Sequence, residues 1–172
     1  MARNVEIKAR VEDFEALTQK AASLADQGPI EIHQDDTFFN CPNGRLKLRA
    51  FSPAEGQLIF YVRPDQEGPK ECSYIIAPTS TPDTLRGLLS QAYGQAGRVR
   101  KHRTLYLSGR TRIHLDRVEG LGHFMELEVV LADAEPVESG EAEAKDLMKK
   151  LGIASGQLIE GAYVDLLAQK QS

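Results

Sequence analysis

The sequence lacks several features that would place it quickly in a class of proteins. No run approaches the roughly 18 apolar residues of a membrane-spanning helix, and the chain begins with a strand pattern, without the apolar core of a signal peptide. There are only two cysteines, Cys41 and Cys72, and their spacing is not that of a metal site. We therefore expect a cytoplasmic protein with reduced thiols and no contact with membranes.

Internal repeats, low-complexity segments and interdomain linkers are also missing. A chain of 172 residues fits one domain, which we expect to span residues 1–172. The formal net charge of −4 argues against a general nucleic-acid-binding protein. It leaves room for a local cluster of positive charge, which is the unusual feature of this chain.

Alternating polar and apolar residues predict most of the strands. The most distinctive segment is a hairpin, in which strands over residues 110–118 and 123–131 flank a short glycine-containing turn. Further strands are predicted over residues 4–11, 30–40, 45–50, 57–63, 70–77 and 98–107. The strand from Arg45 to Ala50 alternates most clearly, with three cations on one face and aliphatic side chains on the other.

Apolar residues at helical spacing predict four helices, each with one apolar stripe that needs a sheet surface to cover. The helices are expected from Phe14 to a stop at Gly28-Pro29, from Pro82 to Gly94 or Gly97, from after Pro136 to Gly152, and from a cap at Ser155 to Leu167. Together with the strands, they indicate an α+β fold.

Positive charge gathers on one face of several predicted strands. The same-face cations are Lys8, Arg10, Arg45, Lys47, Arg49, Arg63, Lys101, Arg103 and Arg112. On a single strand such a face is most simply the solvated side of a half-buried sheet. On many neighbouring strands, however, like charges destabilise the pairing. Their recurrence therefore favours an anion bound between them.

The fold that reconciles these patterns is an antiparallel β-barrel with helices packed on its outside. If the helices cover the apolar outer face, the polar faces point into a hollow that can hold a ligand. A small set of carboxylates would share that hollow: Glu6, Asp116, Glu126 and Glu128. Because Mg²⁺ is usually held by one or two carboxylates together with phosphate oxygens, the expected guest is a triphosphate with Mg²⁺ or Mn²⁺.

Five segments together resemble the CYTH superfamily, the triphosphate tunnel metalloenzymes. They are Asn4-x-Glu6-x-Lys8, Arg45-x-Lys47-x-Arg49, Lys101-x-Arg103-x-x-Tyr106, residues 113–128 and residues 162–167. This superfamily includes class IV adenylyl cyclases, thiamine triphosphatases and inorganic triphosphatases. The resemblance implies an eight-stranded antiparallel tunnel that binds triphosphates with a divalent metal.

By position, the resemblance also implies a role for each group. Glu6, Glu126 and Glu128 correspond to the metal-binding carboxylates, while Glu6, Lys8 and Asp116 correspond to the catalytic set. The implied phosphate-binding set is Lys8, Arg45, Lys47, Arg49, Arg63, Lys101, Arg103 and Arg112.

Two positions depart from the family pattern. Asn4 stands where the family has a first glutamate, and its neutral amide is a weaker ligand for a hard cation. Ala162 stands where a serine usually precedes Tyr163. Neither change removes the cations, so binding should survive better than catalysis. We expect Tyr163 to pack with its hydroxyl at the tunnel mouth. His114 shares the polar face and is within reach of a ligand, but we expect it to make a structural hydrogen bond.

Three functions are compatible with the sequence. A phosphohydrolase, in which water attacks the terminal phosphorus, makes the fewest demands on the site, because it needs no contacts that select a base. A class IV adenylyl cyclase would instead direct the ribose 3′-hydroxyl at the α-phosphorus. A non-catalytic module would hold a triphosphate or polyphosphate without turnover, an alternative that Asn4 keeps in play. In each case the partner is a triphosphate-containing small molecule, and homodimerisation is left open.

Overall fold

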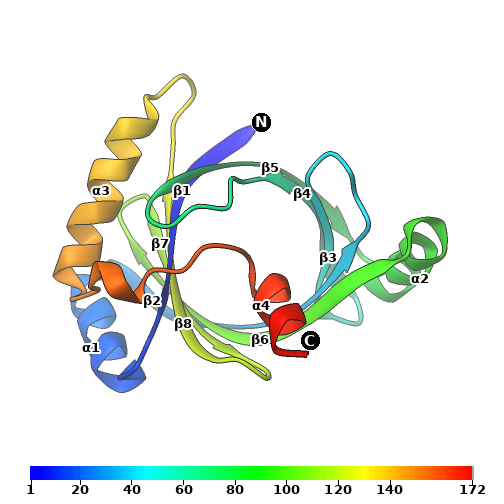
Figure 1. Ribbon diagram of the computed structural model, residues 1–172, viewed down its shortest axis with the longest axis horizontal. Coiled ribbons are helices and arrows are strands. Elements are labelled where there is room, and N and C mark those ends of the chain that lie inside the picture. The colour runs from blue at the N-terminus through cyan, green and yellow to red at the C-terminus, as the bar shows by residue number, and fades with distance from the viewer. Residues whose placement is uncertain (172) are drawn as a thin grey trace.

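The computed structural model describes residues 1–171. Its centre is a closed barrel of eight strands in the order β1-β5-β4-β3-β2-β6-β7-β8, with β8 pairing back onto β1 (Figure 1). Every neighbouring pair is antiparallel. The strands are β1 (Ala2–Arg10), β2 (Gln27–Phe39), β3 (Arg45–Ser52), β4 (Glu55–Val62), β5 (Lys70–Thr79), β6 (Gln95–Ser108), β7 (Thr111–Val118) and β8 (Gly122–Val130).

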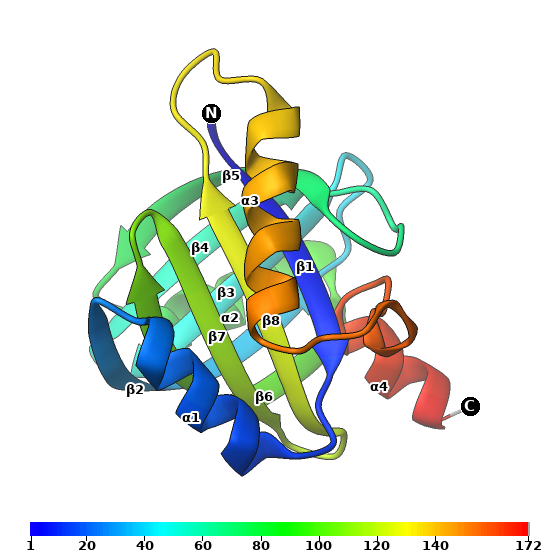
Figure 2. The same ribbon diagram turned by 90° about the vertical axis from the view of Figure 1, so that its left-hand side faces the viewer.

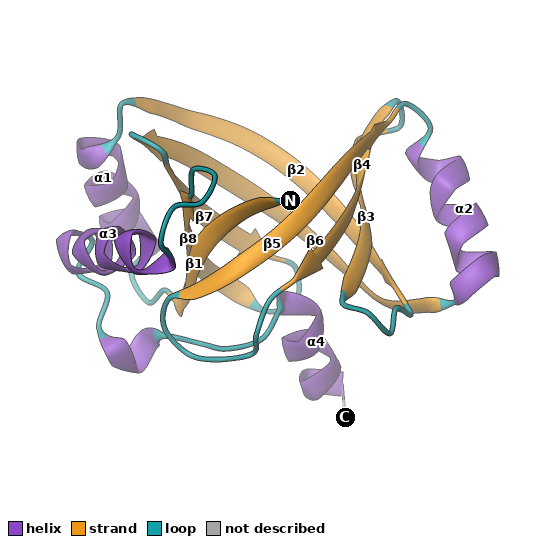
Figure 3. Cartoon of the chain, turned by 90° about the horizontal axis from the view of Figure 1, so that it is seen from above, coloured by secondary structure: helices purple, strands orange, loops and turns teal. Residues whose placement is uncertain are grey.

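Helices pack on the outside of the barrel, as predicted. Those in the described part of the chain are α1 (Phe14–Leu24), α2 (Pro82–Tyr93), α3 (Val137–Lys150) and α4 (Tyr163–Gln171). Figure 2 shows α1 and α3 lying over β1, β7 and β8. Figure 3 shows α2 on the opposite side, where it contacts β2, β3 and β4. The predicted fold class is confirmed.

The apolar faces of the strands point outward, beneath the helices. Ile7 in β1, Ile113 in β7 and Leu127 in β8 are fully buried, and they share one cluster with Leu17 of α1 and Leu147 of α3. Burying a side chain of this size stabilises the fold by about 1.5–3 kcal/mol. Successive side chains of a strand point to opposite faces of the sheet. Because the apolar side chains lie on the outer face, the polar side chains point into the barrel.

The start of α4 packs at one end of the barrel, beside β6 (Figure 1). Tyr163 and Val164 pack there with Phe38, Val99 and other apolar side chains that face inward. A Cβ placed on Gly97 would lie 2.4 Å from Cγ2 of Val164, and the backbone φ of Gly97 is +151°. Glycine is therefore required for α4 to approach β6 this closely.

The predicted stop of the first helix at Gly28-Pro29 is wrong. The helix ends at Leu24, and the Gly28-Pro29 pair lies within β2. The backbone N–H of Asp26 donates to the carbonyl oxygen of Leu107 at 2.7 Å. The chain therefore pairs with β6 immediately after the helix, which prevents further helical turns.

The predicted cap at Ser155 is also wrong. Ser155 begins a short 3₁₀ turn, Ser155–Gln157, and α4 starts only at Tyr163. The backbone N–H of Ile159 donates to the carbonyl oxygen of Lys8 at 3.0 Å, and Leu158 forms an isolated bridge with Ala9. This segment is thus held extended against β1, where it cannot be helical.

Candidate functional site

A hollow of about 300 Å³ inside the barrel gathers most of the predicted site residues. Those that line it are Glu6, Lys8, Lys47, Arg49, Arg63, Lys101, Arg103, Arg112, Glu126 and Glu128. They come from β1, β3, β6, β7, β8 and the residue that follows β4. The strand periodicity alone was enough to place these side chains on one inner surface.

Arg45 is placed differently from the other predicted phosphate ligands. Its Nη2 atom donates to Asp165 Oδ2 of α4 at 2.6 Å, and its side chain is 34% exposed. Arg45 therefore ties α4 to the barrel. To reach a phosphate it would first have to release Asp165.

The main cationic cluster surrounds an aspartate that the sequence pattern did not single out. Asp36 of β2 is 1% exposed. It accepts two hydrogen bonds from Arg49, both at 2.8 Å, and lies 3.2 Å from Lys47 Nζ and 3.4 Å from Lys101 Nζ. Burial alone would raise the pKa of Asp36, but the charges of Arg49, Lys101 and Lys47 outweigh it and hold this pKa well below its usual value.

One carboxylate among three cations leaves an excess of positive charge. Burial lowers the pKa of Lys101 to about 7, although Asp36 opposes that shift. An incoming polyanion would supply the missing negative charge and favour the protonated ammonium. The positive charge of this cluster is therefore not fully neutralised by the protein, and a bound anion would neutralise it.

A second polar cluster lies where α4 meets the hollow. Asp116 is fully buried and accepts two hydrogen bonds from Arg103, both at 2.8 Å, and one from the Tyr163 hydroxyl at 2.7 Å. Lys8 Nζ lies 4.1 Å from the centre of the Tyr163 ring. The Tyr163 hydroxyl is therefore inside the protein, so the expectation of a hydroxyl at the mouth is wrong. Through these hydrogen bonds, Asp116 orients the side chains of Arg103 and Tyr163.

Acidic residues gather on the wall formed by β1, β7 and β8. Ligand atoms of His114, Glu126 and Glu128 all lie within 4.8 Å of one another. Glu6 faces Glu128 in the register of β1 and β8, and its Oε2 is 3.5 Å from Arg63 Nη1. Burial, together with the charge of Glu128, raises the pKa of Glu6 to about 7. A divalent cation bound here would relieve this repulsion, so the residues present fit such an ion.

Three buried polar atoms of residues lining the hollow have no hydrogen-bond partner within residues 1–171. They are Asn4 Oδ1, Gln34 Oε1 and His114 Nδ1. A buried polar atom left unpaired typically costs about 1–3 kcal/mol. Water or a ligand in the hollow would satisfy these three atoms. The expected structural hydrogen bond of His114 is not made at Nδ1, and burial lowers the pKa of this imidazole to about 4.

Lys70 is a further buried cation that the strand pattern did not single out. Its side chain is 1% exposed, and its Nζ donates to the carbonyl oxygen of Gln66 at 2.6 Å. Burial and the nearby charges of Arg63 and Lys8 lower its pKa to about 8. It could have been found as the first residue on the inward face of the strand predicted over residues 70–77.

Away from α4, the hollow has a partly exposed apolar rim. Ile32, Phe51, Ile76 and Leu105 line it without being buried, and Ile76 is 43% exposed. The amide of Gln57 lies among the same lining residues. An organic group attached to a phosphate chain could pack against this rim.

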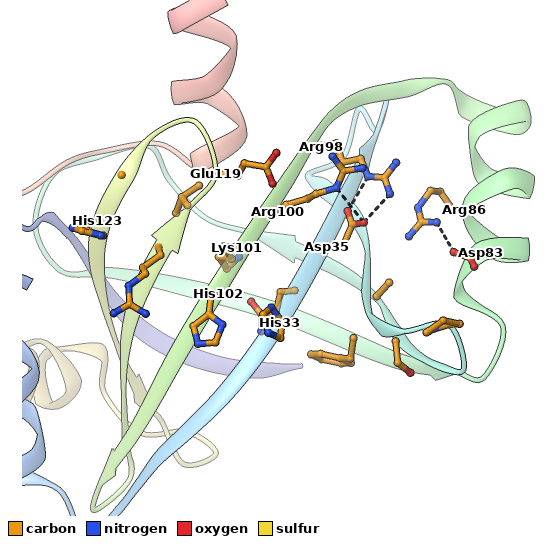
Figure 4. A pocket seen from close by; sticks show the side chains of 18 residues that line it. His33, Asp35, Asp83, Arg86, Arg98, Arg100, Lys101, His102, Glu119 and His123 are labelled. Atoms are coloured by element: carbon orange, nitrogen blue, oxygen red, sulfur yellow. Dashed lines mark hydrogen bonds and ion pairs between the residues drawn. The ribbon is translucent and has the colours of Figure 1, made fainter.

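A larger hollow, of about 700 Å³, lies on the outer face of β2 and β6, between α2 and the turn from β7 to β8 (Figure 4). Three of its arginines contact carboxylates of the same hollow, and Arg117 lies over the Phe14 ring instead. Arg98 and Arg100 contact Asp35 at 2.7 and 3.5 Å, and Arg86 contacts Asp83 at 2.7 Å. These pairs are partly exposed, whereas the cations of the inner hollow are buried around one carboxylate, so the inner hollow is the stronger candidate for a polyanion site.

A model of the CYTH domain matches residues 2–163. The chain belongs to the CYTH family. This confirms the resemblance inferred from the strand motifs, and the closed barrel of this CYTH domain is the predicted tunnel.

Curated relatives cover almost the whole CYTH domain. The chain is 28% identical over 173 residues to adenylate cyclase CyaB of Aeromonas hydrophila, an alignment covering 96% of this chain and 88% of the relative. It is 23% identical over 169 residues to a putative adenylate cyclase of Methanocaldococcus jannaschii, covering 94% and 97%.

Solved structures share the fold. The PH1012 protein from Pyrococcus horikoshii superposes with a TM-score of 0.83 at 24% identity, covering 95% of this chain and 98% of that chain. A putative adenylyl cyclase from Hippeastrum, described as having a dominant triphosphatase activity, gives a TM-score of 0.62 at 19% identity, covering 87% and 88%. Within residues 1–171, no helix is both long and apolar enough to cross a membrane.

Proposed function

We propose that this CYTH domain is a metal-dependent phosphohydrolase that binds a triphosphate inside its barrel. The observation that carries the proposal is the meeting, in one hollow, of a buried cluster with excess positive charge and a group of carboxylates beside it. The substrate is an inorganic, thiamine or nucleoside triphosphate.

The cations divide into two groups around the bound chain. Lys47, Arg49 and Lys101 already converge on the Asp36 carboxylate, so they are positioned for an anionic oxygen. Arg103 is held rigidly by Asp116. Phosphoryl transfer depends mainly on positioning and on electrostatic stabilisation, and prepositioned cations supply both.

Glu126 and Glu128, with Glu6 beside them, would hold the divalent cation, Mg²⁺ or Mn²⁺. When bound, such an ion neutralises phosphate charge and polarises the phosphorus for attack. The chain's own groups then keep the phosphate chain extended, and Lys8 faces the same wall, 3.5 Å from Glu126. Asn4 adds a neutral amide where a further carboxylate would have strengthened the site.

Adenylyl cyclase activity is the second candidate, and two observations favour it. Both curated relatives carry adenylate cyclase names. The rim formed by Ile32, Phe51, Ile76 and Leu105 offers apolar contacts, and Gln57 an amide, to a purine base. Cyclisation would yield cyclic AMP and pyrophosphate, whereas hydrolysis releases orthophosphate.

A product assay on the purified protein tests these alternatives. ATP, thiamine triphosphate and tripolyphosphate are each incubated with Mg²⁺ and with Mn²⁺, while orthophosphate, pyrophosphate and cyclic AMP are quantified. Orthophosphate release supports the hydrolase, and cyclic AMP with stoichiometric pyrophosphate supports the cyclase. Tight binding of tripolyphosphate by calorimetry without any product, even with Mn²⁺, would identify a binding module instead.

Carboxylate variants test the metal assignment. Glu126→Ala and Glu128→Ala should each abolish metal-dependent turnover, while circular dichroism shows an intact fold. Glu119→Ala, at an exposed carboxylate on the outside of the barrel, is the matched control and should keep full activity. Full activity in both inner variants would overturn the assignment.

A further inference from the structure

We propose that His114 is a nitrogen ligand of the divalent cation, so that the metal site consists of His114, Glu126 and Glu128. This inference rests on the proposed function only in placing a divalent cation within the barrel. It adds an imidazole nitrogen to the carboxylate oxygens that the proposed function assigns to the ion.

The sheet register fixes the three side chains beside one another. Glu126 and Glu128 alternate along β8 and share its inner face. His114 of β7 is the direct register partner of Glu126, and the Cβ atoms of such partners are typically about 4.5–5.5 Å apart. The ligand atoms already lie within 4.8 Å of one another. An octahedral ion with bonds of about 2.1 Å sets neighbouring ligands about 3.0 Å apart and opposite ligands about 4.2 Å apart, so side-chain rotations that bring these three atoms closer together would complete the site.

The unpaired nitrogen of His114 is the second observation. His114 is 4% exposed, and its Nδ1 has no hydrogen-bond partner among the described residues. The closest carboxylate oxygen, Glu128 Oε1, is 3.6 Å away, which is too far for a hydrogen bond. A neutral imidazole with a free nitrogen beside two carboxylates has the character of a metal ligand.

The other three histidines do not compete for this role. His33, His102 and His123 all line the outer hollow rather than the barrel interior (Figure 4). Any imidazole bound to a cation inside the barrel must therefore come from His114. This makes the inference testable by spectroscopy, because the signal can arise from one residue only.

A nitrogen ligand also changes which divalent metal ions the site binds most tightly. Carboxylate and water ligands suit Mg²⁺, whereas imidazole favours later first-row ions, along the order Mn²⁺ < Fe²⁺ < Co²⁺. Replacing His114 should therefore weaken Co²⁺ binding more than Mg²⁺ binding. Loss of a group that merely supports a ligand typically costs about 10–100-fold in metal affinity, so the loss of Co²⁺ affinity in His114→Gln should be at least about tenfold.

Electron spin echo envelope modulation spectroscopy of bound Mn²⁺ tests the assignment of His114 as a ligand directly. The full-length protein is loaded with Mn²⁺ and tripolyphosphate in nitrogen-free buffer, beside the variants His114→Gln and His102→Gln. We expect ¹⁴N modulation from one imidazole in the wild type and in His102→Gln, and none in His114→Gln. Calorimetry with Co²⁺ and Mg²⁺ gives the change in selectivity, and thermal unfolding checks that His114→Gln is folded.

The outcomes separate this inference from the proposed function. Mn²⁺ bound through oxygen alone, or ¹⁴N modulation that persists in His114→Gln, overturns the role of His114. If the wild type still hydrolyses tripolyphosphate in that case, the proposed function stands. If the wild type binds no Mn²⁺ even with tripolyphosphate present, the inference fails, and the product assay then decides whether the proposed function fails with it.

Discussion

The substitution Asp36→Asn should destabilise the free protein and strengthen its response to tripolyphosphate. Within residues 1–171, Asp36 is the one carboxylate in contact with the cations of Lys47, Arg49 and Lys101, at distances of 2.8–3.4 Å. The amide keeps the shape but removes the negative charge. Three buried cations would then repel one another without compensation.

The expected magnitude follows from the burial of this cluster. Removing one partner of a buried ion pair typically costs about 3–5 kcal/mol. In a domain of this size, each kcal/mol lowers the melting temperature by about 2–4 °C. The variant should therefore melt at least about 6 °C below the wild type. The neighbouring variant Asp35→Asn is a matched control, because Asp35 faces outward and its partly exposed pairs with Arg98 and Arg100 are worth at most about 1 kcal/mol.

Differential scanning fluorimetry with and without tripolyphosphate provides the assay. The ligand no longer competes with the Asp36 carboxylate, so the ligand-induced rise in melting temperature should be larger in Asp36→Asn than in the wild type. If Asp36→Asn melts within about 2 °C of Asp35→Asn, or gains no more from tripolyphosphate than the wild type does, then Asp36 does not hold the cations in place of a ligand.

The stabilities of the wild type and Asp36→Asn should also differ in their dependence on pH. The pKa of Asp36 is lowered in the folded state, so its stabilising effect is complete above the unfolded-state pKa of about 3.9. It is lost as the pH falls through the lower, folded-state pKa. Because the wild type loses this contribution and Asp36→Asn has none to lose, the stability difference between the two proteins should shrink below about pH 4. A constant difference down to pH 2 would contradict this linkage.

The remaining predictions concern α4 and the wall beside it. Gly97→Ala should destabilise the protein by about 1–3 kcal/mol in urea unfolding, because its Cβ would collide with Val164; unchanged stability would mean that α4 is loosely docked. Tyr163→Phe should cost about 1–3 kcal/mol, because buried Asp116 loses a hydrogen bond, and equal denaturation midpoints would argue against that contact. Arg63→Ala should weaken tripolyphosphate binding in calorimetry, since the contact of Arg63 with the Glu6 carboxylate is long at 3.5 Å and leaves the guanidinium able to bind a phosphate; unaltered affinity would remove Arg63 from the phosphate-binding set.

The sequence predicts the barrel well because strand alternation is a local property. Whether Lys47 or Leu48 faces inward depends only on the pleat of β3, and the helical stripes then decide which face is covered. The same reasoning places Glu126 and Glu128 on the inner face. It cannot tell how closely side chains from different strands approach.

What the sequence does not predict depends on register and on long-range contacts. Asp36 sits beside Asp35 in the sequence, and only the pairing of β2 with β3 sets it opposite Arg49. His114 becomes the neighbour of Glu126 through the β7–β8 register. Arg45 continues the alternation of its strand, yet Asp165 of α4, 120 residues later, binds it.

The docked start of α4 makes the two ends of the barrel different. Tyr163 and Val164 pack at the end beside α4, whereas Ile32, Phe51, Ile76 and Leu105 border the hollow farther from this helix. Under the proposed function, a phosphate chain that enters past the apolar border would present one terminus to the cations first. Such an asymmetry would favour shortening of a long substrate from a terminus over cutting it in the middle.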